Sequence, residues 1–89
     1  MAWTIEFAPE AVRELKHLDR QAARRVFRFL EERLSEHENP AVLGERLQGV
    51  RFSGLTRFRV GNYRIIAEID EVIRIVLVVR VAHRREVYK

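Results

Sequence analysis

The sequence contains no cysteine, so a disulfide framework is excluded and nothing ties the chain to an oxidising compartment. Lysine is scarce as well, because only Lys16 and Lys89 occur among 17 basic residues. No apolar run approaches the length of a membrane span. The N-terminal segment contains Glu6 and Glu10 and no apolar stretch, which is unlike a signal peptide. We therefore expect a cytoplasmic protein with no membrane partner.

The chain has 89 residues, of which 47% are hydrophobic, as is usual for a globular protein. This length predicts a single domain over residues 1–89 that buries a little over ~60% of its unfolded surface. A core of that size leaves no room for a deep cavity. We expect any functional site to lie on the surface or in a shallow groove.

The net charge of +4 is distributed unevenly along the chain. Residues 1–45 carry seven basic and nine acidic side chains, whereas residues 46–89 carry ten basic and four acidic ones. The basic side chains are almost all arginines, whose planar forks suit phosphate oxygens. A GC-rich genome would also favour arginine over lysine, but it would not explain why the arginines gather in the second half.

The hydrophobic pattern predicts an α+β domain. An alternating strand at residues 3–7 precedes a helix that Pro9 opens and that reaches Leu18. A second helix is expected over about 20–37 and ends at Asn39-Pro40, and a loop or single helical turn follows over 40–54. A hairpin over 55–69 and a turn at 70–71 come next. The chain then forms a central strand over 72–81, covered on both faces, and a tail over 82–89. We expect the two helices to pack on one face of a small twisted sheet, whose last three strands form an antiparallel meander.

The second predicted helix has one strongly charged face. We expect this face to be solvated and to hold local ion pairs, with a partner surface as the alternative. Its members are Arg24, Arg25, Arg28, Glu31, Glu32, Arg33 and Glu36.

The most informative stretch is the predicted hairpin, which turns at Gly61-Asn62. A two-residue loop there pairs Val60 with Tyr63 and puts Arg59 opposite Arg64. Alternation then places Arg57 on the same face. Like charges directly opposite each other destabilise a sheet, so we expect a polyanion, and hence nucleic acid, to bind there. The alternative is a merely solvated sheet face.

Several segments together resemble a known family. They are residues 3–7 before a helical hairpin, Leu47-Gln48-Gly49, the stretch 55–64 that ends in RVGNYR, and the stretch 79–88 that ends in HRREVY. With them the chain resembles the RelE/ParE superfamily of bacterial and archaeal toxins, and within it the RelE-type messenger-RNA interferases. The resemblance spans essentially the whole chain and implies a RelE-like fold.

The resemblance implies a toxin that cuts mRNA in the ribosomal A site and that a RelB-type antitoxin neutralises. Operator DNA would be bound only through the complex with that antitoxin. Metal-free RNA cleavage needs a base for the 2′-hydroxyl, cations around the phosphorane and an acid for the departing 5′ oxygen. The products would be a 2′,3′-cyclic phosphate and a 5′-hydroxyl end.

Arg57, Arg59 and Arg64 match the positions that bind and polarise phosphate in this family. The first two are lysines in well-known RelE members. An arginine keeps the positive charge but cannot act as a base at neutral pH. A mechanism that uses lysine as the base is therefore not expected here.

The candidates for proton transfer lie mostly near the C-terminus. Arg84 and Tyr88 match the family's C-terminal arginine and tyrosine, which would contact phosphate and stack on a base or relay a proton. His83 is the histidine close to this set, histidine being the usual proton carrier in general acid/base catalysis, and relatives such as the YoeB branch pair a histidine near this place with a glutamate ahead of the hairpin. Glu45 is the matching glutamate, so a Glu45–His83 acid/base pair is a second mechanism. His17 is expected on a helix surface.

We expect no cofactor and no metal site, because no His/Cys/carboxylate cluster has ligand spacing. Two other functions stay open. One is a ParE-type inhibitor of DNA gyrase with the same fold, and the other is a degenerate toxin or nucleic-acid binder without catalysis.

Overall fold

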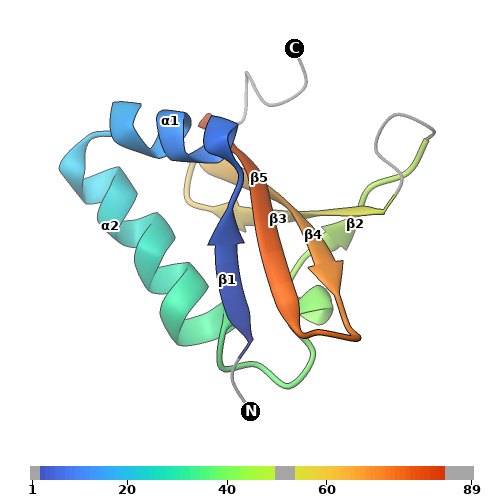
Figure 1. The fold of residues 1–89 in the computed structure, drawn as a ribbon. Coiled ribbons are helices and arrows are strands. Elements are labelled where there is room, and N and C mark those ends of the chain that lie inside the picture. Colours follow the sequence, from blue (N-terminus) through green and yellow to red (C-terminus); the bar gives the residue numbers. More distant parts are fainter. Residues whose placement is uncertain (1–2, 50–53, 84–89) are drawn as a thin grey trace.

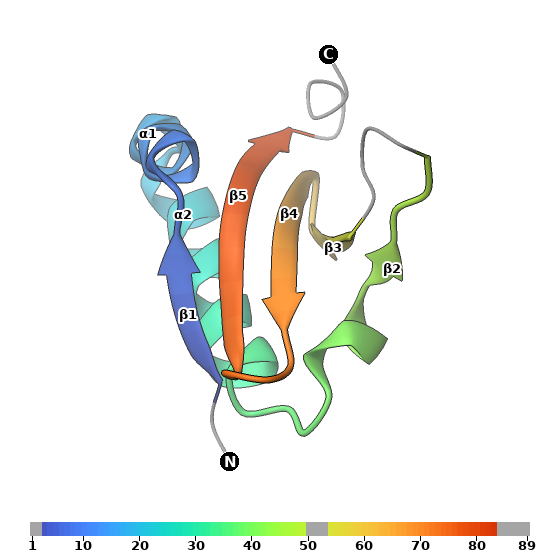
Figure 2. The same cartoon turned by 45° about the vertical axis from the view of Figure 1, so that its right-hand side comes forward.

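A computed structural model of the chain describes residues 3–49 and 54–83. Two helices pack on one side of a five-stranded mixed sheet, which confirms the predicted α+β fold (Figures 1 and 2). The strands are β1 (Thr4–Phe7), β2 (Glu45–Arg46), β3 (Leu55–Val60), β4 (Tyr63–Asp70) and β5 (Ile75–His83). The helical elements are α1 (Pro9–His17), α2 (Arg20–Arg28), a π-helical continuation η1 (Phe29–Leu34) and a 3-10 turn η2 (Pro40–Leu43).

The helix boundaries follow from local chemistry. Pro9 occupies the first turn of α1, where its missing N–H costs no hydrogen bond. The Asp19 side chain caps α2 by accepting a hydrogen bond from the backbone N–H of Ala22 at 2.8 Å. The second helix and η1 are continuous, so one long helical segment runs from Arg20 to Leu34.

The strand order is β1-β5-β4-β3-β2. Strands β3, β4 and β5 form the expected antiparallel meander, while β1 adds to the far side of β5 in parallel. The two-residue strand β2 pairs with β3 and was not predicted, since residues 40–54 were expected to hold only a loop or a helical turn. The helical turn is present as η2.

The last strand begins later than expected, because Asp70 shapes a longer turn. Its carboxylate accepts hydrogen bonds from the backbone N–H groups of Val72 at 3.0 Å and Ile73 at 3.2 Å, as Asx turns do. Arg74 follows with a φ of 56°. The prediction of a strand from Val72 was therefore wrong, and the side chains of Val72 and Ile73 are 93% and 61% exposed.

The core lies between the helices and one face of the sheet. Its fully buried members include Val26 and Leu30 from the helical side and Phe58, Ile65 and Val76 from the strands. The other sheet face has only a small cluster, in which Leu47, Leu55 and Val79 are half-buried around Ile66 and Ala82. The expectation that β5 is covered on both faces by packed layers was wrong, because α1 and α2 lie on one side (Figure 2). We call the face without helices the open face.

A β-bulge in β5 changes which face its last residues occupy. Ala67 pairs with Val78, but the next residue, Ile66, pairs with Arg80, so Val79 is an extra residue. Because side chains alternate along a strand, one extra residue turns every later side chain to the opposite face. After the bulge, Val81 faces the core and Ala82 faces the open side.

Candidate functional site: an arginine-lined notch on the open face

The hairpin has the predicted register. Val60 pairs with Tyr63, and Arg59 lies directly opposite Arg64. Arg57 pairs with Ile66, a residue of the open-face cluster. Alternation therefore puts all three arginines on the open face of the sheet. The side chain of Arg59 is exposed, whereas Arg57 and Arg64 are half-buried.

Glu45 is brought to this cluster by strand β2. It pairs with Arg57 in the register, and its carboxylate accepts a hydrogen bond from the Arg57 guanidinium. The Arg57 side chain is 16% exposed while that of Glu45 is 65% exposed, so the bridge lies at the rim. Glu45 thereby reduces the positive charge at one end of the cluster.

The preceding Gly44 lets this segment approach β3 closely. A Cβ atom at Gly44 would lie 2.6 Å from the carbonyl oxygen of Arg57 and 2.7 Å from the ring of Phe58. Only a residue without a side chain fits at that distance. The result is a notch of about 140 Å³ between Leu43–Glu45 and the side chains of Arg57 and Arg59.

The other two arginines are held differently. Arg64 folds back on the turn, where its Nη1 donates to the carbonyl oxygens of Gly61 at 3.3 Å and Tyr63 at 3.1 Å. These contacts leave a fixed guanidinium beside the hairpin. Among residues 3–49 and 54–83, no carboxylate pairs with Arg59. Arg59 is thus a cation available for a ligand at the centre of the cluster.

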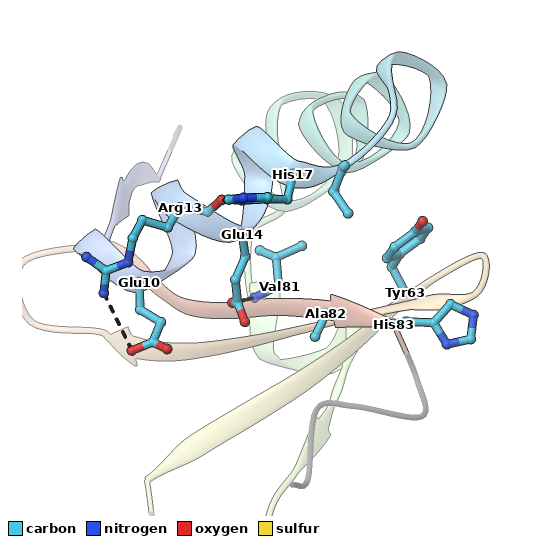
Figure 3. A pocket seen from close by; sticks show the side chains of 9 residues that line it. Glu10, Arg13, Glu14, His17, Tyr63, Val81, Ala82 and His83 are labelled. Atoms are coloured by element: carbon cyan, nitrogen blue, oxygen red, sulfur yellow. Dashed lines mark hydrogen bonds and ion pairs between the residues drawn. The ribbon is translucent and has the colours of Figure 1, made fainter.

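The bulge takes His83 away from the arginines. His83 pairs with Tyr63, and their rings meet edge to face with centroids 5.8 Å apart. Both side chains line a groove of about 500 Å³ beneath α1, together with Glu14 and His17 (Figure 3). This groove is on the helix side of the sheet, so His83 does not join the arginine cluster.

The Glu45–His83 acid/base pair is not formed. Glu45 is on edge strand β2 and His83 is on β5, with β3 and β4 between them. Three strand spacings amount to about 14 Å, which is far beyond hydrogen-bond reach. The prediction of this pair was wrong, and the physical reason is the strand order together with the bulge.

Glu14 fixes the end of β5 within this groove. Its Oε1 accepts from the backbone N–H of Val81 at 2.7 Å, and its Oε2 accepts from Nε of Arg80 at 2.9 Å. The hydrogen bond to Glu14 raises the pKa of the Arg80 guanidinium above its usual value. Strand β5 is therefore anchored to α1 just before the segment that carries the C-terminal candidates. Arg84 and Tyr88 themselves lie outside the described residues.

The comparisons with known proteins assign the chain to a family. A family model for the ParE toxin of the type II toxin–antitoxin system parDE matches residues 5–88. The chain belongs to this toxin family. It is a member of the RelE/ParE superfamily and a toxin of a type II toxin–antitoxin system.

Solved structures give the same assignment. The toxin is similar to a chain of the RelBE2 toxin–antitoxin complex from Mycobacterium tuberculosis, with 30% identity, a TM-score of 0.85, and coverage of 94% of this chain and 100% of that one. It is also similar to a chain of the RelB–RelE complex from Methanococcus jannaschii, with 26% identity, a TM-score of 0.68, and coverage of 93% and 94%. The isolated E. coli RelE toxin, at 22% identity and a TM-score of 0.71 over 98% and 92% of the two chains, shares the fold. No curated protein sequence matches the toxin.

Sequence reasoning missed two groups near the candidate site of the toxin. Tyr63 was treated only as a register partner, yet it lies against His83. Arg25 was assigned to a solvated helix face, yet its guanidinium packs against the hairpin turn: a Cβ on Gly61 would lie 2.9 Å from its Nη1. No local pattern reports that a helix face and a hairpin turn are neighbours, since they are distant in sequence.

Two kinds of site are absent from residues 3–49 and 54–83 of the toxin. No helix in these ranges is long and apolar enough to cross a membrane. No group of three or more His, Cys, Asp or Glu side chains in these ranges is placed to hold a metal ion.

Proposed function

We propose that the toxin is an endoribonuclease that cleaves mRNA in the ribosomal A site without a metal. The observation that supports this proposal is the direct opposition of Arg59 and Arg64, with Arg57 beside them, on a sheet face that no helix covers. A phosphorane gains more negative charge in the transition state than the phosphodiester has in the ground state. Preorganised guanidinium groups therefore lower the barrier more than they strengthen substrate binding.

In the proposed reaction, the 2′-oxygen attacks the adjacent phosphorus and the bond to the 5′ oxygen breaks. The proton of the 2′-hydroxyl goes to a base, and a proton is delivered to the departing 5′ oxygen. The arginines cannot supply the base, because the guanidinium stays protonated at neutral pH. His83 faces the groove beneath α1, so Tyr88, with Arg84 at the phosphate, is the candidate that we favour for proton transfer.

The test is primer extension on purified ribosomes programmed with mRNA. We expect discrete cuts within the A-site codon, and we expect Arg59→Ala and Arg64→Ala to slow cleavage by about 10²-fold or more. Arg59→Ala is informative because that side chain has no ion-pair partner among the described residues. Arg24→Ala on the exposed face of α2 is the matched control. Folded wild-type toxin that leaves the mRNA uncut would overturn the proposal.

The partner that we propose is a RelB-type antitoxin made with the toxin. The similar structures from M. tuberculosis and M. jannaschii are toxin–antitoxin complexes. A cationic open face suits an acidic or amphipathic segment that folds on binding. We expect that segment to neutralise the arginine cluster, and we expect operator DNA to be bound only by the toxin–antitoxin complex.

A second candidate is inhibition of DNA gyrase through protein contacts. It is favoured by the family model, which is that of the ParE toxin. A supercoiling assay separates the two functions. Inhibition by the wild type, unchanged in Arg64→Ala, together with uncut mRNA, would support gyrase as the target.

A further inference from the structure

A second basic surface adjoins the notch. The groove between α2–η1 and the turn of the β3–β4 hairpin has a volume of about 360 Å³. Four arginines line it: Arg25 and Arg28 from α2, Arg33 from η1, and Arg59 from β3. We call it the helix–hairpin groove. Three of the four come from a segment about thirty residues away from Arg59 in sequence, so only the tertiary fold creates this concentration of charge.

The groove holds one carboxylate, that of Glu32. It lies 3.7 Å from Nε of Arg28, in an exposed i,i+4 pair. Such exposed pairs contribute little to stability. Within residues 3–49 and 54–83, no carboxylate pairs with Arg25, Arg33 or Arg59. The groove therefore keeps an excess of positive charge.

Two of these cations are positioned by neutral neighbours. The guanidinium of Arg33 lies 5.6 Å from the centroid of the Phe29 ring, within the range of cation–π attraction. The guanidinium of Arg25 lies next to the hairpin turn, since a Cβ built on Gly61 would be 2.9 Å from its Nη1. Neither neighbour neutralises the charge, and the ring of Phe29 also restricts the side chain of Arg33. Cations held in this way lose less conformational entropy when an anion binds.

The lining favours a phosphate backbone over a protein segment. Peptides that fold in a groove rely on apolar anchors. Here Phe29 is buried to 9% exposure and Val60 is half-buried, so neither side chain is a fully exposed apolar anchor. Arginine forks, by contrast, bind phosphate oxygens in a bidentate manner.

We propose that the helix–hairpin groove binds the phosphodiester backbone of RNA outside the scissile position. Arg59 lines both this groove and the notch, so one strand of phosphates can run from one to the other. The inference rests on the proposed nuclease function, because it extends the RNA-binding surface of the same site beyond the notch. The solvated-face interpretation of the α2–η1 segment would then hold for Arg24 but not for Arg25 and Arg33.

The test measures RNA binding without cleavage. The probe is a fluorescein-labelled single-stranded 2′-O-methyl RNA, which has no 2′-hydroxyl nucleophile, and anisotropy gives its Kd over a series of salt concentrations. The groove variant is Arg25→Gln with Arg33→Gln. The control is Arg20→Gln with Arg24→Gln, which removes the same charge from the same helix but outside the groove.

We expect the groove variant to lower the slope of log Kd against log salt by about 1.4, since each phosphate contact to single-stranded RNA contributes about 0.7. The control should keep the wild-type slope. Circular dichroism should show both variants to be folded. Equal losses in both variants would overturn the proposal, because binding would then depend on net charge alone. A groove variant that binds RNA normally but loses affinity for the antitoxin would overturn it in favour of an acidic protein segment.

The ribosome assay separates this inference from the proposed function. We expect the groove variant to need about tenfold more ribosomes for half-maximal cleavage, with unchanged cut positions and an unchanged saturating rate. If wild-type toxin cuts nothing while RNA binding depends on the groove, the nuclease proposal fails and the groove stands. If the groove variant cuts like wild type at every ribosome concentration, the nuclease stands and the groove proposal fails.

Discussion

The carboxylate of Glu14 accepts a hydrogen bond from the backbone N–H of Val81, where β5 has no further strand partner on that side. Strand β1 pairs with β5 as far as Phe7 opposite Val78, and then the chain turns into α1. The Val81 N–H would be left without a strand partner, but Glu14 accepts from it at 2.7 Å. The same carboxylate also binds Arg80. Helix α1 thus completes the edge of β5 just after the bulge.

We expect Glu14→Ala to destabilise the toxin by about 1–3 kcal/mol, because it leaves a buried N–H and a partly buried guanidinium without their acceptor. Urea unfolding measures the change. Glu10→Ala is the matched control: its 3.9 Å pair with Arg13 is exposed, so we expect a change of less than about 0.5 kcal/mol. Equal midpoints for the two variants would contradict the role given to Glu14.

We expect Gly44→Ala to destabilise the toxin by about 1–3 kcal/mol through overpacking against β3. Gly44 has a φ of −130°, so the cause is the lack of space and not backbone strain. Thermal unfolding followed by circular dichroism gives the result. Val42→Ala, at a side chain that is 63% exposed, should change stability by less than about 0.5 kcal/mol.

We expect Glu45→Gln to tighten RNA binding at low salt by about threefold, since it removes a negative charge that lies against Arg57. Cleavage at saturating ribosome concentration should not fall. Glu31→Gln, also exposed and outside the notch, should leave both quantities unchanged. A cleavage rate lowered by about 10²-fold or more would instead make Glu45 a general base.

We expect His83→Ala to slow cleavage by less than about tenfold, because the ring contacts Tyr63 on the helix side of the sheet. The pH dependence of the single-turnover rate should then be the same in the variant and the wild type. His17→Ala, in the same groove, serves as the comparison. If the pH–rate profile loses an ionisation near neutral pH in His83→Ala but not in His17→Ala, His83 takes part in proton transfer.

Much of the fold could be predicted because its determinants are local. Pro9, Asp19 and the apolar spacing of residues 20–34 define the helices. The Gly61-Asn62 turn fixes the hairpin register, so the opposition of Arg59 and Arg64 was predictable from the sequence. The parallel pairing of β1 with β5 and the strand β2 were not, since both depend on contacts between distant segments.

The sequence by itself determined the α+β class, the hairpin and the face shared by Arg57, Arg59 and Arg64. Side chains alternate between the two faces of a strand, and a two-residue turn fixes which residues of the hairpin lie opposite each other. The tertiary structure decided the rest of the site. The bulge at Val79 turned His83 to the other face, strand order kept it from Glu45, and helix packing brought Arg25 to Arg59. These outcomes depend on pairing between strands and on packing between layers, and no local pattern in one chain encodes them.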